Sequence, residues 1–237
     1  MKTTLPCLAN EGTSCPTVET TYRQDAASAG AVERAVEKDG AGTVRKDTAE
    51  TWQVELAAKP FRAFNIASEV TVNEGGASAT TRVERGFDSF GNQAMLKDFG
   101  RKDVPGDERL TWSYFAPNLS SYILDKPIHL SVWNGHDHLQ PQASIDYFLY
   151  DNQPHNSAPV KGDLSQKIRF KQLSPTEIRS TESFEYDAFG NQTAAIDGIG
   201  RRTLTIYDAA HNLFPVEVLS PLFATDNRHK TNVVYNM

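Results

Sequence analysis

The sequence predicts an all-β protein built from repeated antiparallel β-hairpins. Two observations lead to this prediction. Short runs in which apolar and polar residues alternate are bounded by Gly, Pro, Asn and Asp, which is typical of β-strands and turns. A motif containing an aromatic residue followed by Asp also recurs along the chain. Long apolar runs with helical spacing and caps do not occur, so helices are not expected to dominate.

The N-terminal part of the chain has the least decisive pattern. Residues 1–30 are rich in Thr, Ser, Ala and Asn, and we expect extended or frayed structure there. Residues 31–56 fit two structures. Val32, Ala35 and Val36 have helical spacing, but a Gly-rich turn between two alternating runs indicates a hairpin. The Asp39-Gly40 pair favours the hairpin, because glycine accepts the positive φ that a tight turn needs.

The rest of the chain is a succession of expected strands, each with one face covered. They lie at residues 51–59, 128–133, 143–151, 180–187 and 202–208. Residues 134–142 and 151–163 are loops by composition. Pro127 and Pro141 are expected at strand starts or edges, where their missing N–H costs no ladder hydrogen bond.

The recurring motif reads as a turn. An aromatic-Asp-x-Phe-Gly-Asn-Gln core stands at residues 87–93 and again at 186–192, and weaker copies begin at Tyr150, Tyr207 and Val234. We expect the Asp carboxylate to accept backbone N–H groups and the Gly to take a left-handed conformation. The predicted structural repeat motif comprises Phe87, Asp88, Gly91, Asn92, Tyr186, Asp187, Gly190, Asn191, Gly200, Arg201, Tyr207 and Asp208.

These motifs carry a resemblance to a known family. Tyr-Asp-x-x-Gly-Asn, then Asp-x-x-Gly-Arg-x-Thr, then Tyr-Asp, at residues 186–208, resembles the RHS/YD-repeat family. The stretches "GDERLTWSYFAPNLSSYILDKPIHLSVWNG", "PVKGDLSQKIRF" and "HNLFPVEVLSP" resemble the middle of the B component of bacterial insecticidal toxin complexes and SpvB-like proteins. The resemblance covers residues 81–237, which we expect to be the repeat region, while residues 1–80 form an N-terminal β-rich segment that includes possible degenerate repeats.

The resemblance implies a structural function. In this family a curved, spiralling sheet of hairpins forms a hollow shell around a toxin polypeptide. The chain is therefore expected to be a non-catalytic section of such a shell in a bacterium, made in the cytoplasm and exported or secreted within a larger toxin. Its expected partners are the remaining parts of the shell or toxin complex and an enclosed toxin polypeptide. The family's self-cleaving aspartates are not found, so either a fragment or a chain completed by a partner is expected.

Composition excludes several other classes. A formal net charge of −6 and a pI near 5.5 argue against binding to nucleic acid. The first residues lack the apolar core of a secretory signal, and no apolar run is long enough to span a membrane. A disulfide between Cys7 and Cys15 would close a short loop and stabilise little of the chain, and the sequence does not decide whether it forms.

Sharper functional hypotheses rest on fewer residues. His136 and His138 share a face if their segment is extended, which makes them the weak candidates for a metal site; no cofactor is expected. Asp107 and Glu108 would point to opposite faces of a strand, which argues against a glycosidase pair. No nucleophile motif is present, so an enzyme is not expected. The alternative function is a free-standing carbohydrate-binding or adhesion module, in which the tryptophans at positions 52, 112 and 133 would stack on sugar rings.

Overall fold

The chain forms one antiparallel meander of strands, which confirms the all-β prediction. The computed structural model describes residues 1–5, 15–172 and 176–235. Sixteen strands follow one another in the sheet in their sequence order, from β1 to β16, so each strand pairs with its neighbours in the chain. The residues divide into two compact units, of which unit 1 holds residues 1–112 and 132–143 and unit 2 holds residues 113–131 and 144–237. The predicted boundary between residues 80 and 81 lies within β6.

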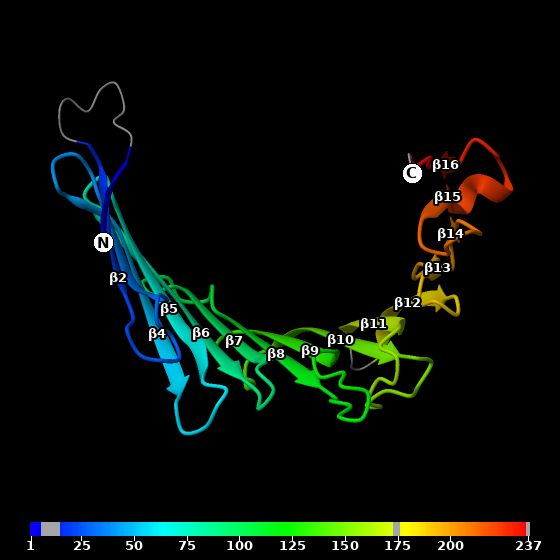
Figure 1. Ribbon diagram of the computed structural model, residues 1–237, viewed down its shortest axis with the longest axis horizontal. Coiled ribbons are helices and arrows are strands. Elements are labelled where there is room, and N and C mark those ends of the chain that lie inside the picture. Colours follow the sequence, from blue (N-terminus) through cyan, green and yellow to red (C-terminus); the bar gives the residue numbers. More distant parts are fainter. Residues whose placement is uncertain (6–14, 173–175, 236–237) are drawn as a thin grey trace. The chain divides into compact units, whose positions relative to one another are not determined.

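Unit 1 contains the longest strands (Figure 1). Its strands are β1 (Lys2–Thr4), β2 (Thr17–Tyr22), β3 (Val32–Lys38), β4 (Val44–Glu55), β5 (Arg62–Glu74), β6 (Ala77–Phe87) and β7 (Gln93–Arg101). Three further strands, β8 (Arg109–Phe115), β9 (Pro127–Asn134) and β10 (Gln142–Tyr150), have residues in both units.

Unit 2 continues the meander with shorter strands. It contains β11 (Leu164–Gln172), β12 (Ile178–Tyr186), β13 (Gln192–Ile196), β14 (Arg202–Tyr207), β15 (Pro215–Leu219), the 3₁₀ helix η1 (Pro221–Ala224) and β16 (Lys230–Asn232). The prediction for the two prolines is confirmed, because Pro127 is the first residue of β9 and Pro141 directly precedes the first residue of β10.

The hairpin prediction for residues 31–56 is confirmed, but the glycine that makes the turn is a different one. Strands β3 and β4 pair in an antiparallel register. Gly42, with φ of 85°, takes the left-handed conformation, whereas Gly40 does not have a positive φ. The reason is that Asp39 is the first residue of the turn, which places the left-handed position three residues later.

The expectation that each strand has one covered face holds only in part: in β4, Trp52 and Val54 are half-buried while Thr51 and Gln53 are exposed. No strict alternation of buried and exposed residues is seen in β9, for example, where Ile128 and Ser131 are buried but Leu130 is only half-buried. Each unit is a single layer of strands, and η1 is the one helical element among the described residues. Side chains are therefore covered by neighbours on the same face rather than by a second layer.

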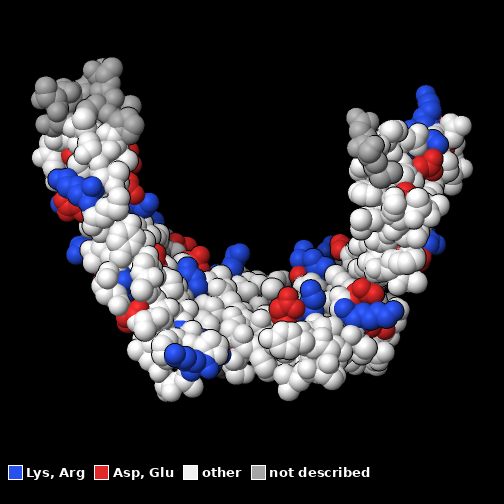
Figure 2. All heavy atoms as spheres, viewed as in Figure 1, with Lys and Arg blue, Asp and Glu red and all other residues white. Residues whose placement is uncertain are grey.

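Ion pairs between adjacent strands supply much of that cover in unit 1. Arg34 on β3 binds both carboxylate oxygens of Asp47 on β4, at 2.9 and 2.5 Å. Lys38 lies 2.7 Å from Glu19 on β2. Figure 2 shows basic and acidic side chains interspersed over the visible surface, as expected for cross-strand pairing of opposite charges.

Two smaller predictions concern the membrane and the cysteines. Within the described ranges, no helix has the length and apolar character needed to cross a membrane. Cys15 is disulfide-bonded, and Cys7 lies outside the described residues.

Candidate functional site

The predicted repeat motif forms a turn closed by an aspartate. After β12, Asp187 Oδ1 accepts the N–H groups of Phe189 and Asn191, each at 2.9 Å. Its Oδ2 accepts the Asn191 side-chain amide at 2.9 Å, and Gly190 takes φ of 86°. These hydrogen bonds, that of the Asn191 side chain first, hold the pKa of Asp187 below its ordinary value. The carboxylate thus satisfies turn amides that have no partner in the sheet.

The earlier copy has the same geometry. Asp88 Oδ1 accepts the N–H groups of Phe90 and Asn92 at 2.9 Å, and its Oδ2 accepts the Asn92 side chain at 2.9 Å. Gly91 has φ of 92°. Two turns in different units are therefore built alike, down to the hydrogen bonds of the aspartate.

Two further turns share this arrangement. Asp197 Oδ1 accepts the N–H of Arg201 at 2.9 Å, its Oδ2 accepts Arg201 Nε at 2.7 Å, and Gly200 has φ of 84°. In the predicted hairpin turn, Asp39 Oδ1 accepts the N–H of Thr43 at 2.8 Å and that of Ala41 at 3.0 Å. The Asp-x-x-Gly spacing is the signal that would have assigned the left-handed position of this turn to Gly42 instead of Gly40.

The aromatic residues of the motif tie each strand to the one before it. Tyr186 donates its hydroxyl to the carbonyl of Leu164 at 3.1 Å, and Tyr207 donates to Gln192 at 3.2 Å. Each acceptor is the first residue of the preceding strand. The same bond recurs from Tyr150 to Pro127 at 3.0 Å, from Tyr235 to Pro215 at 3.1 Å, and, with an indole N–H, from Trp52 to Val32 at 2.9 Å.

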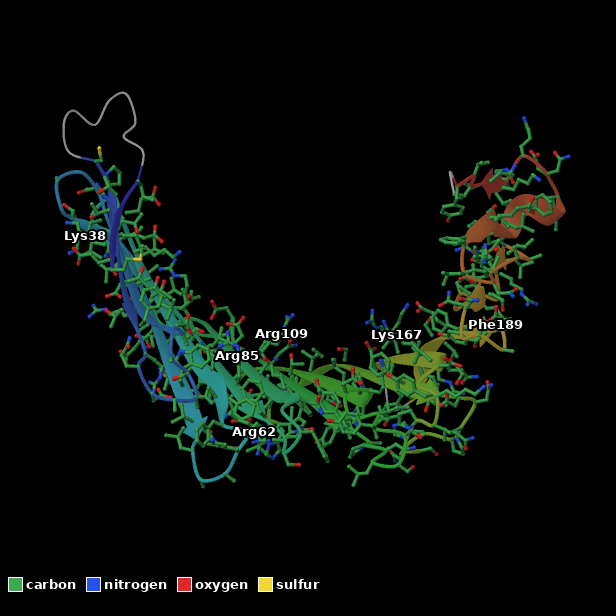
Figure 3. All side chains as sticks on the ribbon, in the orientation of Figure 1. Lys38, Arg62, Arg85, Arg109, Lys167 and Phe189 are labelled. Carbon is green, nitrogen blue, oxygen red and sulfur yellow. The ribbon has the colours of Figure 1, made fainter. Side chains whose placement is uncertain are left out.

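Phe87 has no hydroxyl and packs instead. Its ring stacks on Phe64 of β5, with centroids 4.8 Å apart. Arg62, labelled in Figure 3, is the first residue of β5 and donates to the carbonyl of Ser89 at 2.7 Å, so a residue of another strand stabilises the turn that follows β6. The first copy of the motif thus replaces the tyrosine hydrogen bond by an aromatic stack and an arginine.

The motif also connects successive turns. The Asn191 side chain donates to the carbonyl of Asn212 at 2.7 Å. In that next turn, Asp208 accepts the N–H groups of Phe214, Leu213 and His211, at 2.9, 3.0 and 2.6 Å. These hydrogen bonds, led by that of Phe214, lower the pKa of Asp208 to about 2.

Unit 2 also holds two loops that are fixed to each other. Residues 118–123 are closed by reciprocal backbone hydrogen bonds between Asn118 and Ile123. The Asn118 side chain donates to the carbonyl of Pro159 in the 151–163 loop at 2.8 Å. Four of the five non-glycine residues with positive φ lie in these loops, namely Tyr122, Asp151, Asn152 and Asn156. Such conformations persist where the surrounding structure determines them.

The 151–163 loop is organised by one carboxylate. Asp151 accepts the N–H groups of Val160 at 2.6 Å, Lys161 at 3.0 Å and Asp163 at 3.0 Å. Burial pushes the pKa of Asp151 upward, but the hydrogen bonds of these amides outweigh it and leave the pKa below its ordinary value.

Beneath this loop lies a cluster of aromatic and histidine rings. His155 of the loop stacks on Tyr147 of β10 with centroids 3.9 Å apart. His129 of β9 stacks on Tyr114 of β8 at 5.0 Å and meets Tyr147 edge-on at 4.9 Å. His129 Nε2 lies 2.7 Å from the hydroxyl of buried Ser131.

The weaker sequence candidates are placed apart from this cluster's chemistry. His136 is exposed, stacks on Phe99 at 6.1 Å, and lies 4.0 Å from Asp137, while His138 is exposed. Within the described ranges, no group of three or more His, Cys, Asp or Glu side chains is placed to hold a metal ion. Asp107 and Glu108 accept backbone N–H groups of their own turn, from Arg101 and Gly106.

A surface pocket on unit 2 is lined by both apolar and charged side chains. It has a volume of about 530 Å³ and lies against strands β12 to β14 and η1. Phe184, Ile196 and Leu222 line it together with Asp197 and Arg201. Asp197 and Arg201 already pair with each other at 2.7 Å in the turn, and Glu182 is a third charged side chain of the lining.

The fold resembles those of toxin-complex structures, although the sequence matches no family model and no curated protein. The crystal structure of TcdB2-TccC3-TEV superposes with a TM-score of 0.66 over 96% of this chain, at 11% identity, and this chain covers 18% of that one. The Photorhabdus luminescens Tc holotoxin pore gives 0.54 over 90% of this chain and 18% of that one, at 10% identity. The crystal structure of TcdB2-TccC3 gives 0.52 over 90% and 19%, at 10% identity.

This likeness concerns the fold. Residues with so little sequence identity share a path of the backbone, not a demonstrated activity. The chain also spans only 18–19% of the length of these structures, so the likeness concerns one portion of each of those longer chains.

Proposed function

We propose that this chain is a non-catalytic structural section of an RHS-type shell that encapsulates a toxin polypeptide or helps to deliver it. The observation that carries the proposal is the repeated unit itself. Each aspartate turn and each aromatic tie is used to fix one strand to its neighbour, as between Tyr186 and Leu164. An array of this kind builds a wall by repetition, because each unit buries its side chains mainly against the next.

The fold likeness to the toxin-complex structures supports the same proposal, since it extends over 90% or more of the chain. Under this proposal the partners are the remaining sections of the shell and an enclosed polypeptide. Export as part of a larger bacterial toxin follows from the same role.

Half-burial of the tryptophans bears on the alternative of a carbohydrate-binding module. Trp52, Trp112 and Trp133 are all partly buried, and Trp52 donates its indole N–H to the carbonyl of Val32. A ring held in this way has less free face for a sugar, so no observation favours the alternative over the wall.

Purification of the tagged chain from the bacterium that makes it tests the proposal. The expected result is a hollow particle by electron microscopy, containing further repeat polypeptides and a segment that resists added protease until the particle is denatured. As a matched control, the same purification uses the Gly190→Val variant, in which the turn after β12 should be strained. Recovery of the native chain alone, without any protected polypeptide, would contradict the proposal.

A further inference from the structure

The ring cluster of unit 2 fastens a loop to the sheet through histidine. His155 lies on the 151–163 loop, and its ring reaches back to Tyr147 of β10 at 3.9 Å between centroids. His129 of β9 lies 6.3 Å from His155. Two ionisable rings from segments separated by a hairpin are thus packed into one aromatic stack.

The strands under the loop present uncharged side chains to these rings. Successive residues of a strand point to opposite faces, and Tyr147 is paired with Ile168 while Ile145 is paired with Phe170. The Asp146–Arg169 ion pair of the same two strands occupies the alternate positions and hence the opposite face. By this alternation, the rings' face of the unit 2 parts of β8–β11 includes the uncharged side chains of Tyr114, Ser131, Ile145, Tyr147, Leu149, Gln166, Ile168 and Phe170 beside His129. On the next strand, Arg179 is paired with Phe170 and forms an ion pair with Glu177 at 3.4 Å.

Charged groups of the two loops are directed elsewhere. Asp151 is occupied by the N–H groups of its own loop, at 2.6–3.2 Å. Asp125 and Lys126 of the preceding loop pair with each other at 3.9 Å. The other ionisable residues of the 151–163 loop, apart from His155, are Lys161 and Asp163. Lys161 is exposed, and the charge of Asp163 acts on Tyr186, whose pKa is raised first by burial and then by this charge.

The position of His155 makes a positive charge there costly. Its Nε2 atom is buried and has no hydrogen-bond partner. Burial lowers the pKa of His155, and burial followed by the charge of His155 lowers the pKa of His129. No carboxylate offsets either effect, so the closed stack favours the neutral form of both rings.

We propose that the stack of His155, Tyr147 and His129 is a proton-operated clasp, which holds the 151–163 loop on the sheet at neutral pH and releases it in mildly acidic solution. Protonation would place two positive charges 6.3 Å apart on an uncharged face. In the released loop, the protonated ring of His155 is exposed to water and can donate hydrogen bonds to it.

The direction of the pH dependence follows from the lowered pKa values. The open loop binds protons with the ordinary histidine pKa near 6.5, and the closed loop binds them only at lower pH. Closure is therefore fully favoured above about pH 6.5, and this contribution is lost as pH falls toward the pKa of the closed state.

Release would extend to the second loop. The carbonyl of Pro159 accepts the Asn118 side chain at 2.8 Å, so opening of residues 151–163 removes this tie. Leu119 and Tyr122, which are 68% and 82% exposed, lie on the loop that would be freed.

Hydrogen exchange tests the clasp on the full chain. Protection of the Val160–Asp163 amides is measured at about pH 7.5 and about pH 5.5, the range in which histidine titrates, after correction for the intrinsic exchange rate. We expect protection to fall in acid, by at most about tenfold for each histidine at pH 5.5, which is one pH unit below the ordinary histidine pKa of 6.5, while the Asp39–Thr43 turn of unit 1 stays unchanged. His155→Phe keeps an aromatic ring and should diminish the fall, whereas the same replacement at exposed His138 should leave it intact.

Two results would overturn the proposal. One is equal protection of the loop at both pH values in the native chain, and the other is an undiminished acid effect in His155→Phe. Should that variant not fold, an NMR titration of the native imidazoles decides: His155 and His129 must titrate below exposed His138, and titration at or above His138 refutes the clasp.

Discussion

Removal of a single hydroxyl tests whether the aromatic ties stabilise the sheet. Tyr150 is 7% exposed, and its hydroxyl donates to the carbonyl of Pro127, the first residue of β9, at 3.0 Å. Tyr150→Phe keeps the ring but leaves that carbonyl without this donor. A hydrogen bond of this kind contributes about 0.5–1.5 kcal/mol, and burial places Tyr150 in the upper half of that range.

Thermal unfolding is a suitable assay for the Tyr150 prediction. For a chain of this size, a loss of about 1 kcal/mol lowers Tm by roughly 2–4 °C. The control is Tyr235→Phe, which removes an equivalent bond of 3.1 Å from a residue that is 37% exposed, where water can replace the lost donor. Equal shifts for the two variants, or no shift for Tyr150→Phe, would refute the argument from burial.

The same hydroxyl gives a second measurement at high pH. Burial, followed by the charges of Asp125 and Tyr186, raises the pKa of Tyr150 to about 12. Because the folded state retains this proton longer than the unfolded one, stability should be complete below about pH 10 and decline as pH rises toward about 12. Tyr150→Phe should lack this part of the alkaline decline.

Three further predictions address the turns and the ion pairs. Gly190→Val should lower the unfolding free energy by roughly 1–3 kcal/mol, because valine resists the positive φ of this turn; Ala188→Val in the same turn should cost clearly less, and similar urea midpoints for both would contradict the assignment. The pKa of Asp208 is lowered to about 2, so its carboxylate stabilises the folded chain above about pH 4, and this stabilisation should vanish as pH falls toward about 2. Asp208→Asn should therefore make the unfolding free energy depend less on pH at the acid end of the profile. Arg169→Met leaves Asp146, whose side chain is 7% exposed, without its bidentate partner. Because the arginine itself is half exposed, we expect the unfolding free energy from chemical denaturation to fall by about 1–3 kcal/mol. Adding Asp146→Asn should recover part of this loss, because it removes the unpaired charge.

Local chemistry explains which parts of the fold the sequence could predict. The turn of Asp187 and Gly190 can be predicted from residue spacing alone, because its hydrogen bond and its left-handed glycine both lie within residues 187–191. The Asp39 turn was predicted, but its left-handed glycine was assigned to Gly40, because the turn lacks the aromatic residue that aligns it with the motif; Asp39 nevertheless accepts backbone N–H groups at the same spacing as Asp187.

Local residue spacing could not predict contacts between segments that lie far apart in the sequence. The acceptor of each tyrosine hydroxyl is a backbone carbonyl, and any residue type can supply one, as Leu164 and Gln192 show. The approach of His155 to Tyr147 depends on how the 151–163 loop folds around Asp151. The covered strand face is found in β4 but not in β9, since alternation in the sequence does not reveal whether a second layer of structure exists to pack on it.

The neighbour-to-neighbour order of the strands has a consequence for how the chain is made. Each strand pairs only with the strands directly before and after it in the chain, from β1 through β16. Contacts that are close in sequence form quickly and require little loop-closure entropy. During synthesis the sheet can therefore grow by one hairpin at a time as the polypeptide leaves the ribosome, with the last finished strand serving as the template for the next.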